Sequence, residues 1–331
     1  MTLFVRILAC LGLLALQFAT SSIAHAWDAT SHRLSTYVAW EGLSLETREA
    51  LHEMLEQHPR YQEDFLDQMP AAVMLATEEE QVRWLLGQAS TWPDMARGFQ
   101  GDDLIRYNRP DWHWIDGAWV RGGGEQGNVY VGVDPLPTIE APFAAPNMDE
   151  RDATNIILAL DYNIEQLSHP LSSAAQRAVA LCWVLHLVGD IHQPLHSGAL
   201  VSTELFATGD RGGNGIDTRG GSLHAIWDEA LRSQPFDDTL LRMIATVRQT
   251  DLNTVSPNTS SWLQESRKLM HEFVYPDEIK AAVLRSERRS TSLPSFTLDD
   301  DYTGRMHAIA EDRVTLAGMR LGLVLQRAMG N

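Results

Sequence analysis

The sequence has 331 residues, 44% of them hydrophobic, and a formal net charge of -18 at pH 7. This length and composition suit one large hydrophobic core or two ordinary domains, and they exclude a disordered chain. The charge has the wrong sign for sequence-independent binding to a phosphate backbone. Any affinity for phosphate must therefore be local, from metal ions or a few arginines.

Residues 1–26 have the form of a secretory signal. Arg6 precedes an apolar run from Ile7 to Phe18, and Ala24-His-Ala26 has the small-x-small form of a cleavage site. We therefore expect a mature chain that begins at Trp27 and is exported to the periplasm or the medium. No later run is long and apolar enough to predict a membrane span.

The two cysteines predict no intramolecular disulfide. Cys10 leaves with the signal, and a lipid anchor on Cys10 conflicts with the apolar run, which continues well past it. The remaining cysteine, Cys182, lies one turn before His186 on the same stripe of a predicted helix. We expect Cys182 to be a buried small apolar residue and not a ligand.

Helices are expected first between residues 31 and 88, where apolar residues recur at helical spacing after polar caps. These are a helix capped by Ser31 with Leu34 and Val38 inward, a helix capped by Ser44 with Leu45, Leu51, Met54 and Leu55 inward, and a helix over Glu79–Gln88. Pro93 then predicts a turn over Ser90–Arg97 that presents Asp94. Arg109–Asp116 is expected to be extended.

Helical patterns also dominate the remainder of the chain. The one predicted hairpin covers Arg121–Val133, where valines alternate among glycines, and Gly209–Gly221 is expected to be a mobile loop. Helices are predicted over Asp149–Leu167, from Ala178 to Pro194, after a cap at Ser222, and over Asp237–Gln249, Ser260–Phe273 and Asp301–Ala328. No repeat or linker separates these elements, so we predict one compact, mainly α-helical domain over residues 27–331 with little β structure.

Polar residues interrupt the otherwise apolar stretch from Ala178 to His196. His186 and Asp190 are four residues apart, so a helix places both on one face. Pro194 ends the helix and lets His196 return toward the same space. Because a buried imidazole or carboxylate is costly without a partner, these side chains need partners of their own.

A second histidine–aspartate pair, His224 and Asp228, has the same spacing. One such pair is more often an ordinary hydrogen-bonded or surface pair than a metal site. Two pairs together with His196 favour a metal, and imidazole with carboxylate is a ligand set that zinc prefers. Further candidate ligands are His32, Asp94 and His113.

Several motifs in chain order resemble one known family. They are Trp27 at the expected mature terminus, Trp92-Pro-Asp94, His113-Trp-Ile-Asp116, His186-Leu-Val-Gly-Asp190-Ile-His-Gln-Pro-Leu-His196, Gly212-Gly-Asn214 and His224-Ala-Ile-Trp-Asp228. The pattern resembles the secreted, single-strand-specific zinc nucleases of the fungal S1/P1 type, which are also 3′-nucleotidases. The resemblance covers essentially the whole mature chain. It implies the helical fold shared with zinc-dependent phospholipase C and a cleft with three zinc ions.

The resemblance also implies a role for each ligand. Asp94, His113 and His186 would hold one zinc; the α-amino group and carbonyl oxygen of Trp27, with His32, would hold a second; Asp190 would bridge these two; and His196, His224 and Asp228 would hold the third. An α-amino group of pKa about 7.7–8.0 loses its proton to zinc readily. Signal cleavage would then complete the site.

The function implied is metal-assisted hydrolysis of single-stranded DNA and RNA to 5′-phosphate products, with 3′-nucleotides as further substrates. Asp94 would orient the attacking water or accept its proton, and Arg97 would steady the phosphate or simply form an ion pair. Trp114 would stack on a base or pack in the core. Asp116 and Asn214 complete the expected substrate-binding set.

Two alternatives remain at this stage. A zinc-dependent phospholipase C shares the implied fold. Resemblance to that enzyme would imply the pattern His-x-x-x-Glu, where this chain has His224 and Asp228. A noncatalytic exported zinc-binding protein would need the ligands but not Asp94 as a base. No stable protein partner is implied by either the composition or the resemblance.

Overall fold

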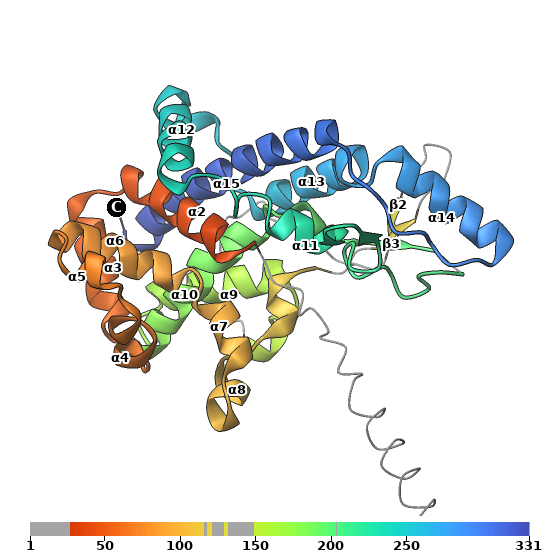
Figure 1. The fold of residues 1–331 in the computed structure, drawn as a ribbon. Coiled ribbons are helices and arrows are strands. Elements are labelled where there is room, and N and C mark those ends of the chain that lie inside the picture. The colour runs from red at the N-terminus through yellow and green to blue at the C-terminus, as the bar shows by residue number, and fades with distance from the viewer. Residues whose placement is uncertain (1–26, 116–117, 121–128, 132–148, 203, 331) are drawn as a thin grey trace, which may run out of the picture.

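Long helices occupy the middle of the fold and shorter ones surround them (Figure 1). The computed structural model describes residues 27–115, 118–120, 129–131, 149–202 and 204–330. Its central helices are α2 Ala29–Gly42, α9 Ile156–Ser168, α10 Ala174–Asp190 and α15 Asp300–Ala328. Helix α15 packs along α2, and α10 packs against α9 while also contacting α2 and α15.

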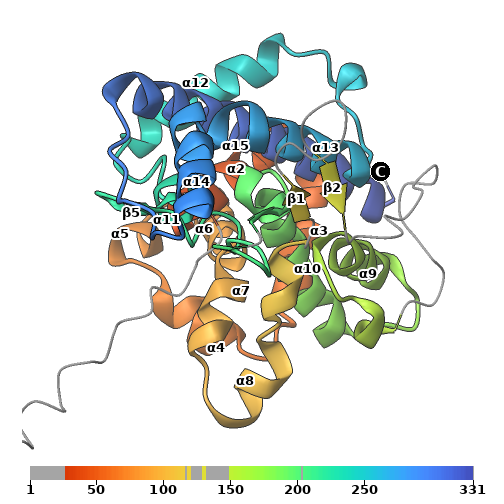
Figure 2. The ribbon, with the colours of Figure 1, turned by 90° about the vertical axis from the view of Figure 1, so that its right-hand side faces the viewer.

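The remaining helices lie around this central group. Those before α9 are α3 Leu45–Leu55, α4 Tyr61–Asp64, α5 Ala71–Met74, α6 Glu78–Ala89, α7 Trp92–Met95 and α8 Gly101–Tyr107. Those after α10 are α11 Leu223–Asp228, α12 Phe236–Gln249, α13 Thr259–Leu269, which continues as a π-helical turn over Met270–Val274, and α14 Asp277–Arg289. Helices α4, α7 and α8 lie together at the lower side of the molecule in both ribbon views (Figures 1 and 2).

The β structure is small. Strand β1 Ala118–Val120 lies between β2 Val129–Val131, which runs antiparallel to it, and β3 Ala199–Val201, which runs parallel. A second ladder pairs β4 Asp217–Thr218 with β5 Gly221–Ser222. The prediction of a mainly α fold with little β structure is confirmed. The hairpin predicted over Arg121–Val133 lies partly outside the described residues.

Helix α10 is the axis of the core. It begins with a capping box, in which the Ser173 hydroxyl accepts from the Gln176 amide and the Gln176 side chain accepts from the Ser173 amide. From Ala180 to Asp190 every residue is buried, so the helix is enclosed on all sides. Its α-helical geometry ends at Asp190, before Pro194, and a 3-10 turn over Pro194–Ser197 follows.

Several predicted boundaries were wrong for local reasons. Asp28, not Ser31, caps α2, because the Asp28 carboxylate accepts the Ser31 amide at 3.1 Å. Leu45 is 69% exposed and not inward, because it occupies the first turn of α3, outside the core. The predicted turn at Pro93 is a short helix, α7, since proline is favoured in the first turn of a helix.

The segments on either side of α9 also differ from expectation. Arg109–Asp116 is not extended throughout, because Pro110–His113 form a 3-10 turn, although Trp114 after the turn has extended backbone angles. The helix predicted from Asp149 begins at Ile156, where the Asn155 side chain caps it. Helix α14 went unpredicted.

No helix in the described ranges is long and apolar enough to cross a membrane. The predicted signal, residues 1–26, and Asp116 lie outside the described residues.

Candidate metal centre

Histidine and aspartate side chains from α2, α7, α10, α11 and two 3-10 turns converge in the middle of the molecule. They form three groups, and within each group one nitrogen or oxygen atom per residue lies within 4.8 Å of the others. The groups are His32, His186 and Asp190; Asp94, His113 and His186; and His196, His224 and Asp228. The sequence predicted these same residues as metal ligands.

The group around His186 joins helix α10 to the turn that follows α8. His186 Nε2 lies 2.9 Å from His113 Nδ1 and 3.0 Å from an Asp190 oxygen, and His113 Nδ1 lies 3.0 Å from the same carboxylate. Asp94 Oδ1 is 3.9 Å from His113 Nδ1 and 4.0 Å from His186 Nε2. Nitrogen and oxygen atoms thus face one another at the spacing of ligands around a shared ion.

His32 adds a second side to this group. Its ring stacks on that of His186 with centroids 4.0 Å apart, and its Nε2 lies 3.4 Å from Asp190 Oδ1. Both atoms are buried and make no hydrogen bond with the described part of the chain. A buried imidazole and carboxylate without hydrogen bonds are costly unless a ligand satisfies them.

The third group lies where α11 meets the turn after α10. The rings of His196 and His224 stack with centroids 5.1 Å apart, and Asp228 lies 3.3 Å from His224 Nε2 and 3.9 Å from His196 Nε2. The Gln193 amide donates to Asp228 Oδ1 at 2.7 Å. Asp228 is therefore held in place by a side chain that the sequence did not single out.

Backbone carbonyls orient three of the histidines. Nδ1 of His186, His196 and His224 donates to the carbonyl oxygens of Ser90, His113 and Gly212 at 2.7–2.8 Å. Because a carbonyl only accepts, Nδ1 carries a proton and Nε2 faces the carboxylates of Asp190 or Asp228. Metal-ligating histidines are typically oriented in this way.

Burial keeps two histidines of the site neutral, whereas, against the effect of burial, Asp190 and Asp94 raise the pKa of His186. Burial lowers the pKa of His113 to about 4 and that of His196 to about 3, so both rings are neutral and keep a lone pair at neutral pH. Burial also raises the pKa of Asp228 well above its ordinary value. A bound divalent cation would stabilise the ionised carboxylate and reverse that shift.

Trp27 is buried, with 1% of its surface exposed. The amide of the next residue, Asp28, donates to the carbonyl oxygen of Asp228 at 3.0 Å. The start of the described chain is therefore attached to the third group. The ligand role of the Trp27 α-amino group stays a prediction.

Asp94 and Arg97 lie at the edge of the metal centre. Their side chains are 17% and 16% exposed, whereas the carboxylate of Asp190 is fully buried. Arg97 Nε lies 3.1 Å from Asp94 Oδ1. The ion pair considered as the alternative role of Arg97 is thus present, and contact with a phosphate stays a prediction.

The expected substrate-binding residues have different surroundings. Trp114 is 39% exposed, so the alternative of plain core packing is wrong. Asn214 is held in its loop, where its Nδ2 donates to the Arg211 carbonyl at 2.8 Å and its Oδ1 lies 3.3 Å from the Ser222 hydroxyl. Its role toward substrate stays a prediction. Asp116 lies outside the described residues.

Glycines allow backbones to approach the histidines. A Cβ at Gly212, where φ is +59°, would lie 2.3 Å from the Leu195 carbonyl oxygen, and the Gly212 carbonyl accepts from His224. The loop predicted to be mobile is anchored here as well: Asp210 accepts from the Leu200 amide and from the Tyr275 hydroxyl. Gly212 of the Gly-Gly-Asn motif thus orients the His224 ring through its carbonyl oxygen.

Gly189→Ala is expected to displace His32, because the new Cβ would lie 2.8 Å from His32 Nδ1. Overpacking of this kind costs about 1–3 kcal/mol. We expect a lower unfolding midpoint in urea and a lower metal content per chain. The control is Gly304→Ala in α15, where nothing lies within 4 Å of the added atom. Equal stability and metal content in both variants would show that Gly189 makes no close contact with His32.

Two residues near the ligands have supporting positions. His192 donates from Nδ1 to the Val188 carbonyl, and its Nε2 accepts from Arg320, so it faces away from the metal centre. Arg320 is in turn bound by Glu265. Cys182 is buried, which confirms the predicted burial.

Comparison with known proteins supports one family. The family model described as S1/P1 nuclease matches residues 27–330. The chain is 28% identical over 183 residues to Endonuclease 2 of Arabidopsis thaliana and 32% identical over 158 residues to Endonuclease 4 of the same plant. These alignments cover 51% and 45% of this chain and 60% and 50% of the relatives, so the chain spans between half and two thirds of their length.

A fungal relative aligns over a longer region. The chain is 26% identical over 254 residues to Nuclease S1 of Aspergillus oryzae, which covers 70% of this chain and 83% of the relative.

Proposed function

Since the chain belongs to the S1/P1 nuclease family, we propose that it is an exported, zinc-dependent endonuclease. It hydrolyses phosphodiester bonds of single-stranded DNA and RNA to products with 5′-phosphates, and it also removes the phosphate of 3′-mononucleotides. The observation that carries this proposal is the convergence of histidine nitrogens and carboxylates into three groups around α10.

The residues present fit zinc ions. Three buried ligand atoms, His32 Nε2, Asp190 Oδ1 and Asp228 Oδ2, make no hydrogen bond within the described structure. Neutral imidazole with carboxylate is a typical zinc ligand set. We propose three zinc ions. Their ligands are Trp27, His32, Asp94, His113, His186, Asp190, His196, His224 and Asp228.

The chemistry is divided between the ions and the side chains. Bound zinc lowers the pKa of water and neutralises charge on the phosphoryl group and the leaving oxygen. Asp94, at the partly exposed edge of the metal centre, orients the water or accepts its proton. Arg97 exchanges its contact with Asp94 for the phosphate oxygens, which match its planar guanidinium.

Trp114→Ala is expected to weaken binding of single strands, because an exposed indole is a stacking platform for a base. Stacking contributes about 1–3 kcal/mol per base, so KM for an oligonucleotide should rise about 5- to 150-fold. Trp114→Phe keeps an aromatic face and should restore most of the loss. A KM that is unchanged in Trp114→Ala would remove this residue from the substrate site.

The test of the function uses mature protein that begins at Trp27. We expect hydrolysis of single-stranded DNA, RNA and a 3′-mononucleotide, much slower hydrolysis of duplex at matched salt, and loss of all activity with a chelator. Hydrolysis of phosphatidylcholine instead would support a phospholipase C. Zinc content without hydrolysis of any substrate would support a noncatalytic zinc-binding protein.

A further inference from the structure

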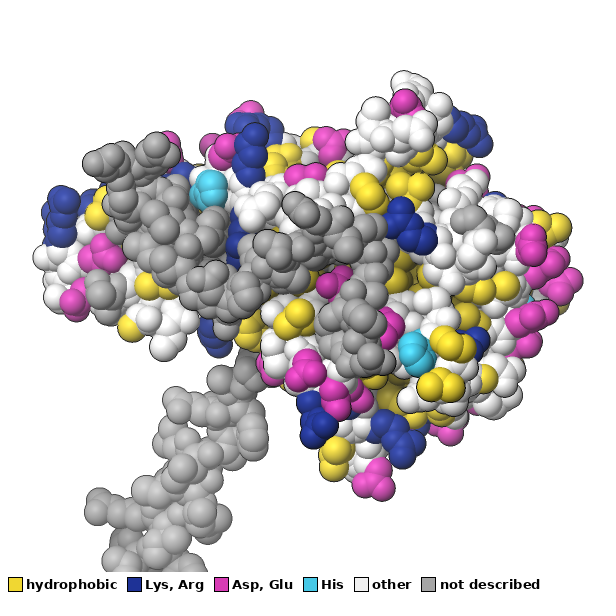
Figure 3. Space-filling model, turned by 180° about the vertical axis from the view of Figure 1, so that it is seen from behind, with side chains coloured by type: hydrophobic (Ala, Val, Ile, Leu, Met, Phe, Trp, Pro, Cys, Tyr) yellow, Lys and Arg dark blue, Asp and Glu magenta, His cyan; other side chains and the backbone are white. Residues whose placement is uncertain are grey.

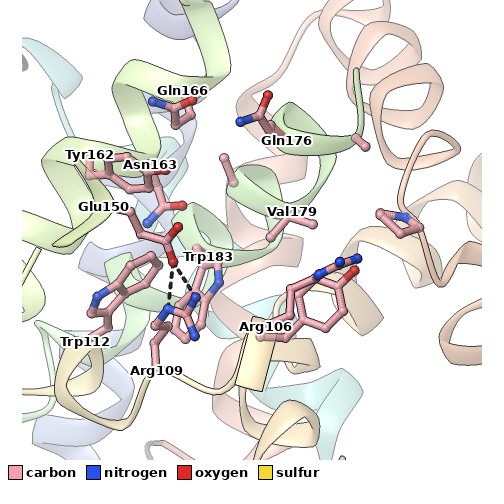
Figure 4. Close-up of a pocket in the computed structure, with 14 residues that line it drawn as sticks. Arg106, Arg109, Trp112, Glu150, Tyr162, Asn163, Gln166, Gln176, Val179 and Trp183 are labelled. Atoms are coloured by element: carbon pink, nitrogen blue, oxygen red, sulfur yellow. Dashed lines mark hydrogen bonds and ion pairs between the residues drawn. The ribbon is translucent and has the colours of Figure 1, made fainter. Parts of the chain in front are cut away.

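A cavity separate from the metal centre lies between α8, α9 and the first half of α10 (Figure 4). Its volume is about 250 Å³. Aromatic side chains supply much of its wall: Tyr107, Trp112, Tyr162 and Trp183. Ligand pockets commonly have about 300–1,000 Å³. This cavity is therefore suited to one flat ring system and not to a large ligand.

One tryptophan in the cavity wall also lies beside the metal centre. The centroid of the Trp183 ring lies 4.7 Å from that of Trp112, which lines the cavity too, and 5.4 Å and 6.3 Å from those of His113 and His186. Trp112 and His113 are neighbours in the chain, and Trp114 after them is exposed. The same short segment thus contributes to the cavity and to the metal centre.

Amide side chains supply polar groups to the cavity. The carbonyl oxygens of Gln166 and Gln176 accept from Ser172 and Ser173, which leaves their Nε2 groups as donors. In Asn163 the nitrogen is the group already used: its Nδ2 donates to the Ala159 carbonyl, which leaves its oxygen as an acceptor. Paired donors and acceptors beside aromatic walls match the edges and faces of a nucleobase.

Charged side chains are unevenly distributed around the cavity. Arg109 is held by Glu150 at 2.7 Å, whereas Arg106 is exposed on α8. Figure 3 shows Lys and Arg side chains at the lower tip of the molecule, together with Asp and Glu side chains. On the side of Gln166, acidic Asp149 and Glu165 line the neighbouring hollow. A phosphate is thus favoured on the α8 side of the cavity.

We propose that this cavity binds one base of a single-stranded nucleic acid that also occupies the metal centre, with the adjoining phosphate toward Arg106. The proposal rests on the proposed function. A base here is bound between aromatic rings, and the amides contact its edge. Substrates long enough to reach both sites gain affinity that a mononucleotide does not.

The test places a large side chain at the edge of the cavity. Ala175 lines it and is partly buried in the first turn of α10, whereas its neighbour Ala174 is exposed and does not line it. We expect Ala175→Trp to lower kcat/KM on a 20-nucleotide single strand, relative to a 3′-mononucleotide, by about 5- to 100-fold, as expected for one lost stacked base. Ala174→Trp, the matched control, should leave this ratio at the wild-type value. An equal ratio in both variants would overturn the proposal.

A second readout does not depend on hydrolysis. Calorimetric titration with adenosine should show a binding event that Ala174→Trp keeps, that Ala175→Trp removes and that Gln166→Leu weakens. Thermal melting confirms that each variant folds. Binding of adenosine to the cavity without cleavage of any strand would refute the nuclease and retain the base site. Cleavage of single strands with identical adenosine binding in all variants would refute the base site and retain the nuclease.

Discussion

Asp94→Asn is expected to abolish most turnover while leaving most of the zinc bound. Asp94 is the most exposed member of its group, 3.9–4.0 Å from His113 and His186, which would still hold the proposed ion without it. An amide is nearly isosteric with the carboxylate but does not accept a proton. Loss of a general base typically costs about 10²- to 10⁴-fold in rate.

The measurement is kcat on a single-stranded oligonucleotide together with metal content by mass spectrometry. Asp111→Asn, an exposed aspartate in the same turn as His113, is the matched control and should behave as wild type. Asp190→Asn gives the contrast: Asp190 contacts His32, His113 and His186, so both metal and activity should be lost. Unchanged turnover in Asp94→Asn would exclude Asp94 as the base.

A chain with one extra residue before Trp27 is expected to lose zinc and most of its activity. The extension converts the α-amino group into an amide, which does not bind zinc as a free amine does, since only the amine loses its proton near neutral pH. The Asp28 amide remains bonded to Asp228, so the fold at this end should persist.

The control for this experiment is the same extended protein after specific removal of the extra residue. Zinc content and activity should return to those of the mature chain. Full zinc content in the extended form would mean that the Trp27 amine is not a ligand, and that the second ion, if present, is held by His32 and Asp190 alone.

The sequence predicted the ligand-bearing helix well, because four-residue spacing on an apolar helix leaves few interpretations. His186 and Asp190 are on one buried face, and Ser222 caps the helix of His224, as predicted. Caps were harder where two polar residues compete. Asp28 and Ser31 are both good caps, and only the observed hydrogen bond shows that Asp28 is the cap.

Other features depend on contacts between distant segments, which no local pattern contains. The carbonyl of Ser90 orients His186 across 96 residues, and Gln193 reaches Asp228 across 35. The aromatic cavity likewise joins Trp112 to Trp183. Helix α14 is different, because Ile279, Ala282, Val283 and Ser286 are buried at helical spacing, so its pattern was visible in the sequence.

The most direct test of the central claim is diffraction from crystals of the mature protein on either side of the zinc absorption edge. The account predicts three anomalous peaks. One lies among Asp94, His113 and His186, one beside His32 and Asp190, and one among His196, His224 and Asp228. No peak at these groups in crystals of active protein, or peaks only elsewhere, would contradict the account.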